Sequence, residues 1–196
     1  MARSASLART TSETEISLTL DLDGSGQADV ATGISFLDHM LTAFARHALF
    51  DLTIRARGDR HIDDHHTTED VGIVLGQALA QALGEKRGIR RFGHALVPMD
   101  EALVEAAVDI SGRAHLAWSV AFERAKVGTM DTELFEEFFR ALAGNARITL
   151  HLMQRAGRNT HHVAEACFKA AARALRMATE PDPRAGDAVP STKGAL

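Results

Sequence analysis

Two copies of one short pattern constrain this chain of 196 residues more than any other feature of its sequence. Asp64-His65-His66-Thr67-Thr68-Glu69 returns later as Thr160-His161-His162-Val163-Ala164-Glu165. Each copy follows a strand-like segment and begins an Ala-rich segment with helical spacing. An internal repeat of this kind predicts two similar halves, which we place at residues 13–92 and 93–180.

The spacing of apolar residues predicts strands and helices in a similar order in both halves. Alternation predicts strands at 15–23, 52–57, 101–110, 114–122 and 147–154. Helical spacing predicts helices at 34–50, 67–83, 132–143 and 161–178. The expected fold class is therefore α/β (α+β), built from a duplicated unit.

Both ends of the chain lack these patterns. Residues 1–12 combine arginines with Ser and Thr, which weakly resembles a transit peptide, and a flexible N-terminus is the preferred interpretation. Residues 181–196 are rich in proline and glycine, so composition alone predicts a loop or a disordered tail.

Composition excludes several classes of protein. The net charge of −4 gives no basic excess for nucleic acid. Cys167 is the single cysteine, which excludes an intrachain disulfide framework and a thiolate zinc cage. No segment reaches the roughly 20 apolar residues that span a bilayer, and no secretory segment is evident, so we expect a cytoplasmic protein without a membrane partner. Ten histidines and 26 carboxylates leave nitrogen and oxygen as metal ligands.

The repeated pattern suits metal binding when both copies act together. His65 and Glu69 lie four residues apart on one helical face, whereas His66 is rotated by about 100° around the helix. Each copy could therefore give two ligands to one ion and one ligand to a second ion. A single His pair is more often a surface or core feature, but the duplication favours a two-ion site. Such ligands suit Mn²⁺, Fe²⁺ or Zn²⁺, and the sequence does not choose among them.

Several further motifs resemble the imidazoleglycerol-phosphate dehydratase family of histidine biosynthesis, from about Glu13 to Gly194. The resemblance is carried by Phe36–Leu41, Gly58–Asp70, Arg90–Gly93, Pro98–Ala102, Asp109–Arg113, Asn159–Leu175 and Val189–Gly194. It implies two four-stranded sheets that sandwich a helical layer. It also implies two Mn²⁺ per active site and a homo-oligomer of 24 subunits with cubic symmetry and metal sites between subunits.

The resemblance implies seven metal ligands by position: His39, His65, His66, Glu69, His161, His162 and Glu165. An eighth position departs from the family, because many members carry a histidine where this chain has Glu137. A glutamate could ligate a hard cation, but glutamates also commonly lie at the surface. The sequence leaves both possibilities open for Glu137.

The resemblance also implies residues that bind the substrate. The phosphate would be held by Arg91, Arg113, Lys169, Ser191 and Lys193, a set of cations and a hydroxyl that suits a dianion. Residues 181–196 would then be a tail that orders over the phosphate. Without the family pattern, the same cations would be interpreted as solvated surface residues.

The implied reaction removes water from D-erythro-imidazole-glycerol phosphate and yields imidazole-acetol phosphate. No carbonyl acidifies the departing hydrogen, so the implied route uses an imidazolate, stabilised by two ions, and a diazafulvene intermediate. Glu13, His47 and Asp100 match family positions near the substrate and are the candidate catalytic residues. Structural roles stay open, since Asp100 could cap a turn and His47 could pack on its own helix.

Two other functions fit a di-metal site. A di-metal phosphoester hydrolase would use the same ligand types to activate water. A metal-storage shell would bind many ions for each subunit, whereas the dehydratase needs only about two, one for each imidazole nitrogen.

Overall fold

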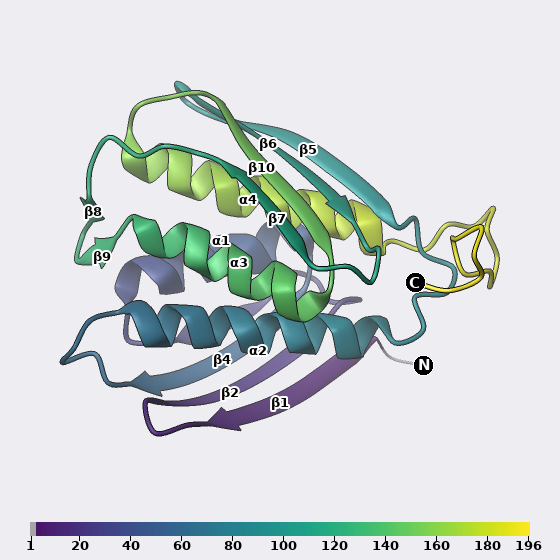
Figure 1. Cartoon of the computed structure of the whole chain (residues 1–196), viewed down its shortest axis with the longest axis horizontal. Coiled ribbons are helices and arrows are strands. Elements are labelled where there is room, and N and C mark those ends of the chain that lie inside the picture. The colour runs from purple at the N-terminus through teal and green to yellow at the C-terminus, as the bar shows by residue number, and fades with distance from the viewer. Residues whose placement is uncertain (1–2) are drawn as a thin grey trace.

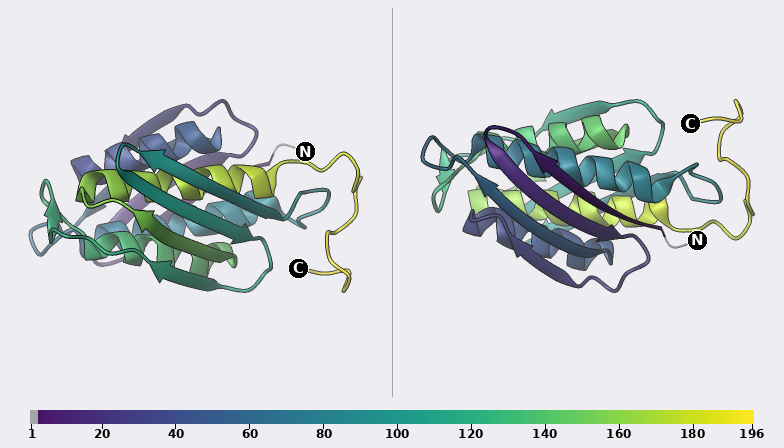
Figure 2. Two further views of the ribbon diagram at one scale, coloured as in Figure 1. Left: turned by 90° about the horizontal axis from the view of Figure 1, so that it is seen from above. Right: turned by 90° about the horizontal axis from the view of Figure 1, so that it is seen from below.

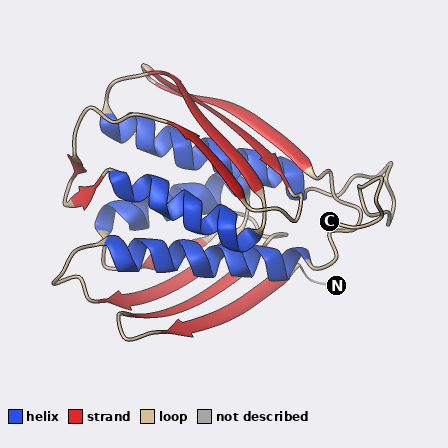
Figure 3. Ribbon diagram, in the orientation of Figure 1, coloured by secondary structure: helices blue, strands red, loops and turns tan. Residues whose placement is uncertain are grey.

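The computed structural model describes residues 3–196, and it places a layer of four helices between two four-stranded sheets (Figures 1 and 3). One sheet covers each side of the helical layer, as the two turned views show (Figure 2). The predicted fold class and the sandwich arrangement are confirmed.

The first half forms one sheet and two helices. Its elements are β1 (Ser4–Thr10), β2 (Thr14–Asp21), β3 (Ala28–Ala31), α1 (Ser35–Ala48), β4 (Asp51–Gly58) and α2 (His65–Leu83). The strand order is β1-β2-β4-β3, with β3 parallel to β4 and the other pairs antiparallel.

The second half repeats this topology. Its elements are β5 (Phe92–Met99), β6 (Ala102–Asp109), β7 (His115–Ser119), α3 (Glu133–Ala146), β10 (Thr149–Ala156) and α4 (Thr160–Thr179). The strand order β5-β6-β10-β7 matches the first sheet, again with one parallel pair at the edge. A small hairpin of β8 (Lys126–Val127) and β9 (Met130–Asp131) is the insertion that distinguishes the second half.

Helices pack across the boundary between the halves. α1 of the first half lies against α4 of the second half, and α2 lies against α3. Gly72 permits the close approach of α2 and α3, because a Cβ there would lie 2.7 Å from the carbonyl oxygen of Phe138. Because α1 packs against a helix of the other half, a residue of α1 lies beside the repeated motif on α4.

Buried and exposed side chains alternate along the strands, which explains why each sheet packs one face on the helices. Ile16, Leu18 and Leu20 on β2 point into the helical layer and are buried, while the residues between them face outward. Val104, Ala106 and Val108 do the same on β6. Each sheet therefore buries one face, as expected for antiparallel strands on a helical core.

The interpretation of residues 1–12 as flexible is wrong for Ser4–Thr10. These residues form β1 and pair with β2 along their whole length, from Ser4 opposite Asp21 to Thr10 opposite Glu15. Arg3 binds Asp23 and the carbonyl oxygen of Thr179, which ties down the start of the strand. The small side chains of this edge strand hide its alternation in the sequence. Met1 and Ala2 lie outside the described residues.

The predicted loop at residues 181–196 follows α4 and folds back onto the chain through backbone contacts. Pro181 forms a bridge with Ile89, and the Gly88 N–H donates to the Ala188 carbonyl oxygen at 2.9 Å. The Arg91 guanidinium donates to the Pro190 carbonyl oxygen at 2.8 Å. The tail thus lies beside the residues that precede β5, at the end of the molecule away from the start of α4 (Figure 1).

Candidate metal centre and active site

Three predicted ligands from two helices form a compact cluster. The Nε2 atoms of His39 on α1 and His161 on α4 lie 3.4 and 3.1 Å from Oε2 of Glu165. One ligand atom from each residue lies within 4.8 Å of the others. Two imidazole nitrogens and one carboxylate oxygen converging in this way fit a divalent cation such as Mn²⁺, Fe²⁺ or Zn²⁺. We call these three residues the α1–α4 cluster.

Lys169 completes the surroundings of Glu165. Its Nζ lies 2.6 Å from Oε1, the carboxylate oxygen that does not face the histidines. Burial would raise the pKa of Glu165, but Lys169 and the two histidines outweigh that effect and lower the pKa. The carboxylate is therefore charged at neutral pH, as metal ligation requires. Ile73 occupies the corresponding place in the first half, so this lysine belongs to the second half alone.

The first-half motif is more open. Nε2 of His65 lies 3.6 Å from Oε2 of Glu69, which confirms that these two side chains share a helical face, and both are half-buried. Glu137 on α3 occupies the position equivalent to His39, but its carboxylate lies 3.8 Å from Nε of Arg140. Across residues 3–196, no ion pair within 4 Å joins Glu137 to His65. The structure therefore brings His65 and Glu69 together and leaves Glu137 apart from them.

His66 and His162 point away from their neighbours, as the helical rotation predicts. Nδ1 of His66 lies 3.0 Å from Asp59, and Nδ1 of His162 lies 2.7 Å from Glu101. These hydrogen bonds raise the pKa of both histidines, and His162 helps lower the pKa of Glu101 to about 2. A carboxylate on Nδ1 fixes the ring and leaves Nε2 for another partner, the usual arrangement around a metal-binding histidine.

Asp59 and Glu101 were missed as functional residues by the sequence reasoning. Both lie inside the motif stretches Gly58–Asp70 and Pro98–Ala102, Asp59 directly after β4 and Glu101 in the turn between β5 and β6. The signal that could have found them is that each is a carboxylate inside a motif stretch that carries the family resemblance.

The candidate catalytic residues lie around these histidines. Glu13 lies 3.9 Å from Nδ1 of His66, and Asp100 lies 3.8 Å from Nε2 of His162. His47, at the end of α1, has a lowered pKa because of burial and the charges of Lys169 and Arg173. The two acids thus lie in matching turns, β1–β2 and β5–β6, each near an outward-pointing histidine but on different ring nitrogens.

The predicted phosphate-binding residues do not converge within one chain. Arg91 binds the Asp109 carboxylate at 2.7 Å, and Arg113 lies 3.9 Å from the same carboxylate. The backbone of Lys193 donates to the Ser191 hydroxyl at 3.2 Å in the adjacent tail. Lys169, by contrast, lies beside the α1–α4 cluster, next to Glu165.

Apart from Lys169, a large distance separates the predicted phosphate-binding residues from the predicted metal ligands on α4. The Arg91 backbone N–H donates to the carbonyl oxygen of Ala178, near the C-terminal end of α4. His161 lies in the first turn of the same helix. At 1.5 Å per residue, those two positions on α4 are about 25 Å apart. One small phosphorylated molecule cannot touch both ends of a single chain.

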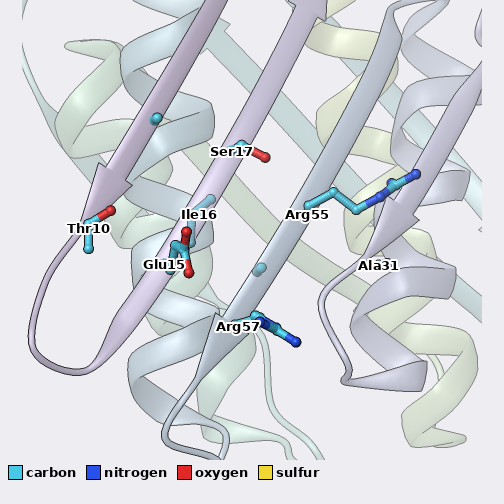
Figure 4. A pocket seen from close by; sticks show the side chains of 9 residues that line it. Thr10, Glu15, Ile16, Ser17, Ala31, Arg55 and Arg57 are labelled. Atoms are coloured by element: carbon cyan, nitrogen blue, oxygen red, sulfur yellow. The ribbon is translucent and has the colours of Figure 1, made fainter.

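A hollow lies elsewhere, on the outer face of the first sheet (Figure 4). Its volume is about 410 Å³, and Thr10, Glu15, Ser17, Arg55 and Arg57 line it. The helices cover the opposite face of this sheet, so the hollow is separate from both histidine motifs. In the described part of the chain, no helix is long and apolar enough to cross a membrane.

Comparisons with known proteins agree with this geometry. Residues 32–175 match the family model described as imidazoleglycerol-phosphate dehydratase. The imidazoleglycerol-phosphate dehydratase of Granulibacter bethesdensis is 78% identical over 196 residues, covering 100% of both chains. That of Gluconacetobacter diazotrophicus is 69% identical, covering 100% of this chain and 98% of the relative.

Solved structures show the same likeness. The crystal structure of the Staphylococcus aureus imidazoleglycerol-phosphate dehydratase has a TM-score of 0.84 and 44% identity, covering 91% of this chain and 99% of that one. The Pyrococcus furiosus structure, in complex with (S)-C348, has a TM-score of 0.84 and 40% identity, covering 97% and 100%. The chain belongs to the imidazoleglycerol-phosphate dehydratase family and is a hydro-lyase.

Proposed function

We propose that this protein catalyses the metal-dependent dehydration of D-erythro-imidazole-glycerol phosphate to imidazole-acetol phosphate in histidine biosynthesis. The observation that carries the proposal is the α1–α4 cluster, in which a family-matching histidine and the repeated motif converge on one point. The imidazolate and diazafulvene route is part of the proposal, as is a cytoplasmic location.

Two Mn²⁺ ions are the proposed cofactors, and each would supply positive charge to one nitrogen of the imidazole ring. His39, His161 and Glu165 would hold one ion, and His65 and Glu69 would hold the other. His66 and His162 offer Nε2 outward from the chain, which suits ligation of an ion held mainly by another copy. Glu137 is the further proposed ligand of the first-half site, and it would need to leave Arg140.

The chain's own residues supply the remaining chemistry. Glu13 would hold or move the proton on the substrate side chain, and His47 or Asp100 would bind a hydroxyl or assist its departure. Arg91, Arg113, Lys169, Ser191 and Lys193 would bind the phosphate dianion with charge-assisted hydrogen bonds.

The separation of metal and phosphate residues supports an active site shared between copies. Because the two ends of α4 are about 25 Å apart, ring and phosphate of one substrate would be held by different chains. We therefore propose a homo-oligomer with metal sites between subunits, of 24 subunits as the family resemblance implies. Treatment with a chelator is expected to reduce the particle to smaller species, measured by light scattering.

Anaerobic metal analysis together with a ketone assay tests the function. The purified protein, loaded with Mn²⁺, is expected to bind about two ions for each chain, one for each ring nitrogen, and to convert the substrate to the ketone. Release of inorganic phosphate without ketone would contradict dehydration and favour the hydrolase. Many ions for each chain, without turnover, would favour storage.

A further inference from the structure

An exposed apolar side chain stands on the loop that precedes the first histidine motif. Ile62 lies between β4 and α2 and is 62% exposed, while its backbone N–H donates to the Asp59 carbonyl oxygen at 2.8 Å. Only two other large apolar side chains of residues 3–196 are comparably exposed, and one of them, Phe92, lies under the Arg91 guanidinium. The turn therefore presents Ile62 to solvent from a fixed backbone. We call residues 59–64 the Ile62 loop.

The loop also carries unneutralised negative charge. Asp59 is held by His66, and Asp64 by Arg60 at 2.9 Å. Asp63 accepts the backbone N–H of His65 at 2.8 Å through one oxygen. Asp63 is exposed, and within residues 3–196 no basic side chain lies within 4 Å of it, so no ion pair neutralises its charge.

A pocket of opposite charge lies beside the second histidine motif. It has a volume of about 390 Å³ and lies between the β8–β9 hairpin and the start of α4. It is lined by Glu123, Arg124, Lys126, Val127, Gly128, Arg158, Asn159, Thr160 and His161. We call it the hairpin pocket. Figure 1 shows the hairpin at the same end of the molecule as the starts of α2 and α4.

Arg124 is the cation of this pocket that is available to a partner. Lys126 is paired with Asp131 at 2.7 Å, and Arg158 is paired with Glu123 at 2.6 Å. For Arg124, no carboxylate lies within 4 Å anywhere in residues 3–196. Its backbone is fixed, because the Thr132 hydroxyl donates to its carbonyl oxygen at 3.0 Å.

We propose that the hairpin pocket receives the Ile62 loop of a second copy of this chain. Ile62 would pack against Val127, and Asp63 would pair with Arg124. The complementary charges favour this contact, and like charges at the same surface would oppose it. Every copy carries both surfaces, so a loop from one chain always finds a pocket on another, which is a heterologous contact.

The place of the two surfaces in the repeat supports a second copy as the partner. The loop leads directly into His65, and the pocket includes His161. Docking would therefore bring the first motif of one chain beside the second motif of another. This inference rests on the proposed function, since it specifies the contact by which copies share metal sites. Within one chain, no hydrogen bond or ion pair among residues 3–196 joins the loop to the pocket.

Charge reversal with rescue tests the contact. The chain concentration for half-assembly in saturating Mn²⁺ is measured by light scattering for wild type, I62D, D63N and R124E. D63N keeps an acceptor for the His65 N–H, and melting by circular dichroism verifies that each variant folds. Each variant is expected to raise that concentration about tenfold or more, as expected for the loss of an interfacial contact. The double variant D63R/R124E is expected to assemble better than R124E.

Two controls match the variants in chemistry but lie away from the contact. L96D places a charge at a side chain that is 58% exposed on β5, and R87E reverses a charge near the C-terminal end of α2. Both are expected to assemble as wild type does. Folded I62D and R124E chains that assemble like wild type overturn the contact, while metal-dependent turnover of wild type leaves the proposed function standing. A wild type that stays a single chain with Mn²⁺ overturns both the contact and the proposed assembly.

Discussion

Nζ of Lys169 lies 2.6 Å from Oε1 of Glu165, while Oε2 of the same carboxylate faces His161 and His39. The two oxygens of one buried glutamate thus have separate partners. The lysine neutralises the carboxylate in the metal-free chain and turns one oxygen toward the histidines.

Replacing Lys169 with Met is expected to destabilise the metal-free protein. The substitution leaves a buried carboxylate without its cation, which costs roughly 1.5–3 kcal/mol for a hydrogen bond to a charged group. Urea unfolding at pH 7 in the presence of a chelator measures the loss. K193M, in the exposed tail, is the control and is expected to change stability by less than about 0.5 kcal/mol. Equal midpoints for K169M and wild type would contradict the role of this pair.

Replacing Glu165 with Gln is expected to lower metal content and turnover together. The amide keeps the size of the side chain but loses the charge that ligation uses. Metal analysis after dialysis and the ketone assay are the measurements. Loss of turnover at unchanged metal content would show that Glu165 is not a ligand.

Replacing Glu101 with Gln is expected to weaken metal binding by roughly 10–100-fold, because Glu101 fixes the His162 ring through Nδ1. The hydrogen bond to Glu101 raises the pKa of His162, so E101Q is also expected to lower that pKa. Calorimetric Mn²⁺ titration and NMR of the metal-free protein measure the two effects. E85Q, at an exposed glutamate after α2, is the matched control.

Replacing Gly72 with Ala tests the contact between α2 and α3. A Cβ there would lie 2.7 Å from the Phe138 carbonyl oxygen and 3.0 Å from the Ala141 Cβ, so overpacking is expected to cost roughly 1–3 kcal/mol. In G144A the new methyl group meets nothing within 4 Å, so the variant is expected to gain up to about 1 kcal/mol from helix propensity. Thermal melts of both variants distinguish the close contact from a general effect of alanine.

The lowered pKa of His47 predicts a loss of stability in acid. Burial and the cations Lys169 and Arg173 lower the pKa of His47 in the folded chain below the value of 6.5 that the unfolded chain has. Unfolding therefore gains a proton as pH falls below 6.5 toward the folded pKa, and stability falls. H47N removes this effect. The difference in free energy of unfolding between H47N and wild type is therefore expected to change with pH, by no more than about 1.4 kcal/mol per pH unit. An NMR titration midpoint above 6.5 would contradict the prediction.

The sequence predicted the duplicated fold and the long elements because their apolar residues repeat strongly. β1, β3 and β5 were missed, since these are edge strands with small or exposed side chains and little alternation. Ser4–Thr10 is the clearest example, because its partner β2 and the anchoring contact of Arg3 lie elsewhere in the chain. Edge strands depend on such tertiary contacts, which a local pattern does not contain.

The candidate site was predictable only in part. The spacing of His65 and Glu69 correctly predicted a shared helical face, and the rotation of His66 was also correct. The meeting of His39 with His161 and Glu165 depends on the packing of α1 against α4. The family resemblance named these three as ligands but did not group them, and the spacing could not. Glu137 occupies the position in the repeat that is equivalent to His39, but it pairs with Arg140 and does not reach His65.

The length of α4 has a genetic consequence. The proposed metal ligands His161 and Glu165 lie in its first turns, and the proposed phosphate-binding residue Arg91 lies beside its end, about 25 Å from His161. In an active site shared between copies, a subunit with E165Q keeps its phosphate end, and a subunit with R91A keeps its metal end. Two inactive alleles expressed together would then restore some activity in mixed particles, up to the fraction of sites that receive both intact ends.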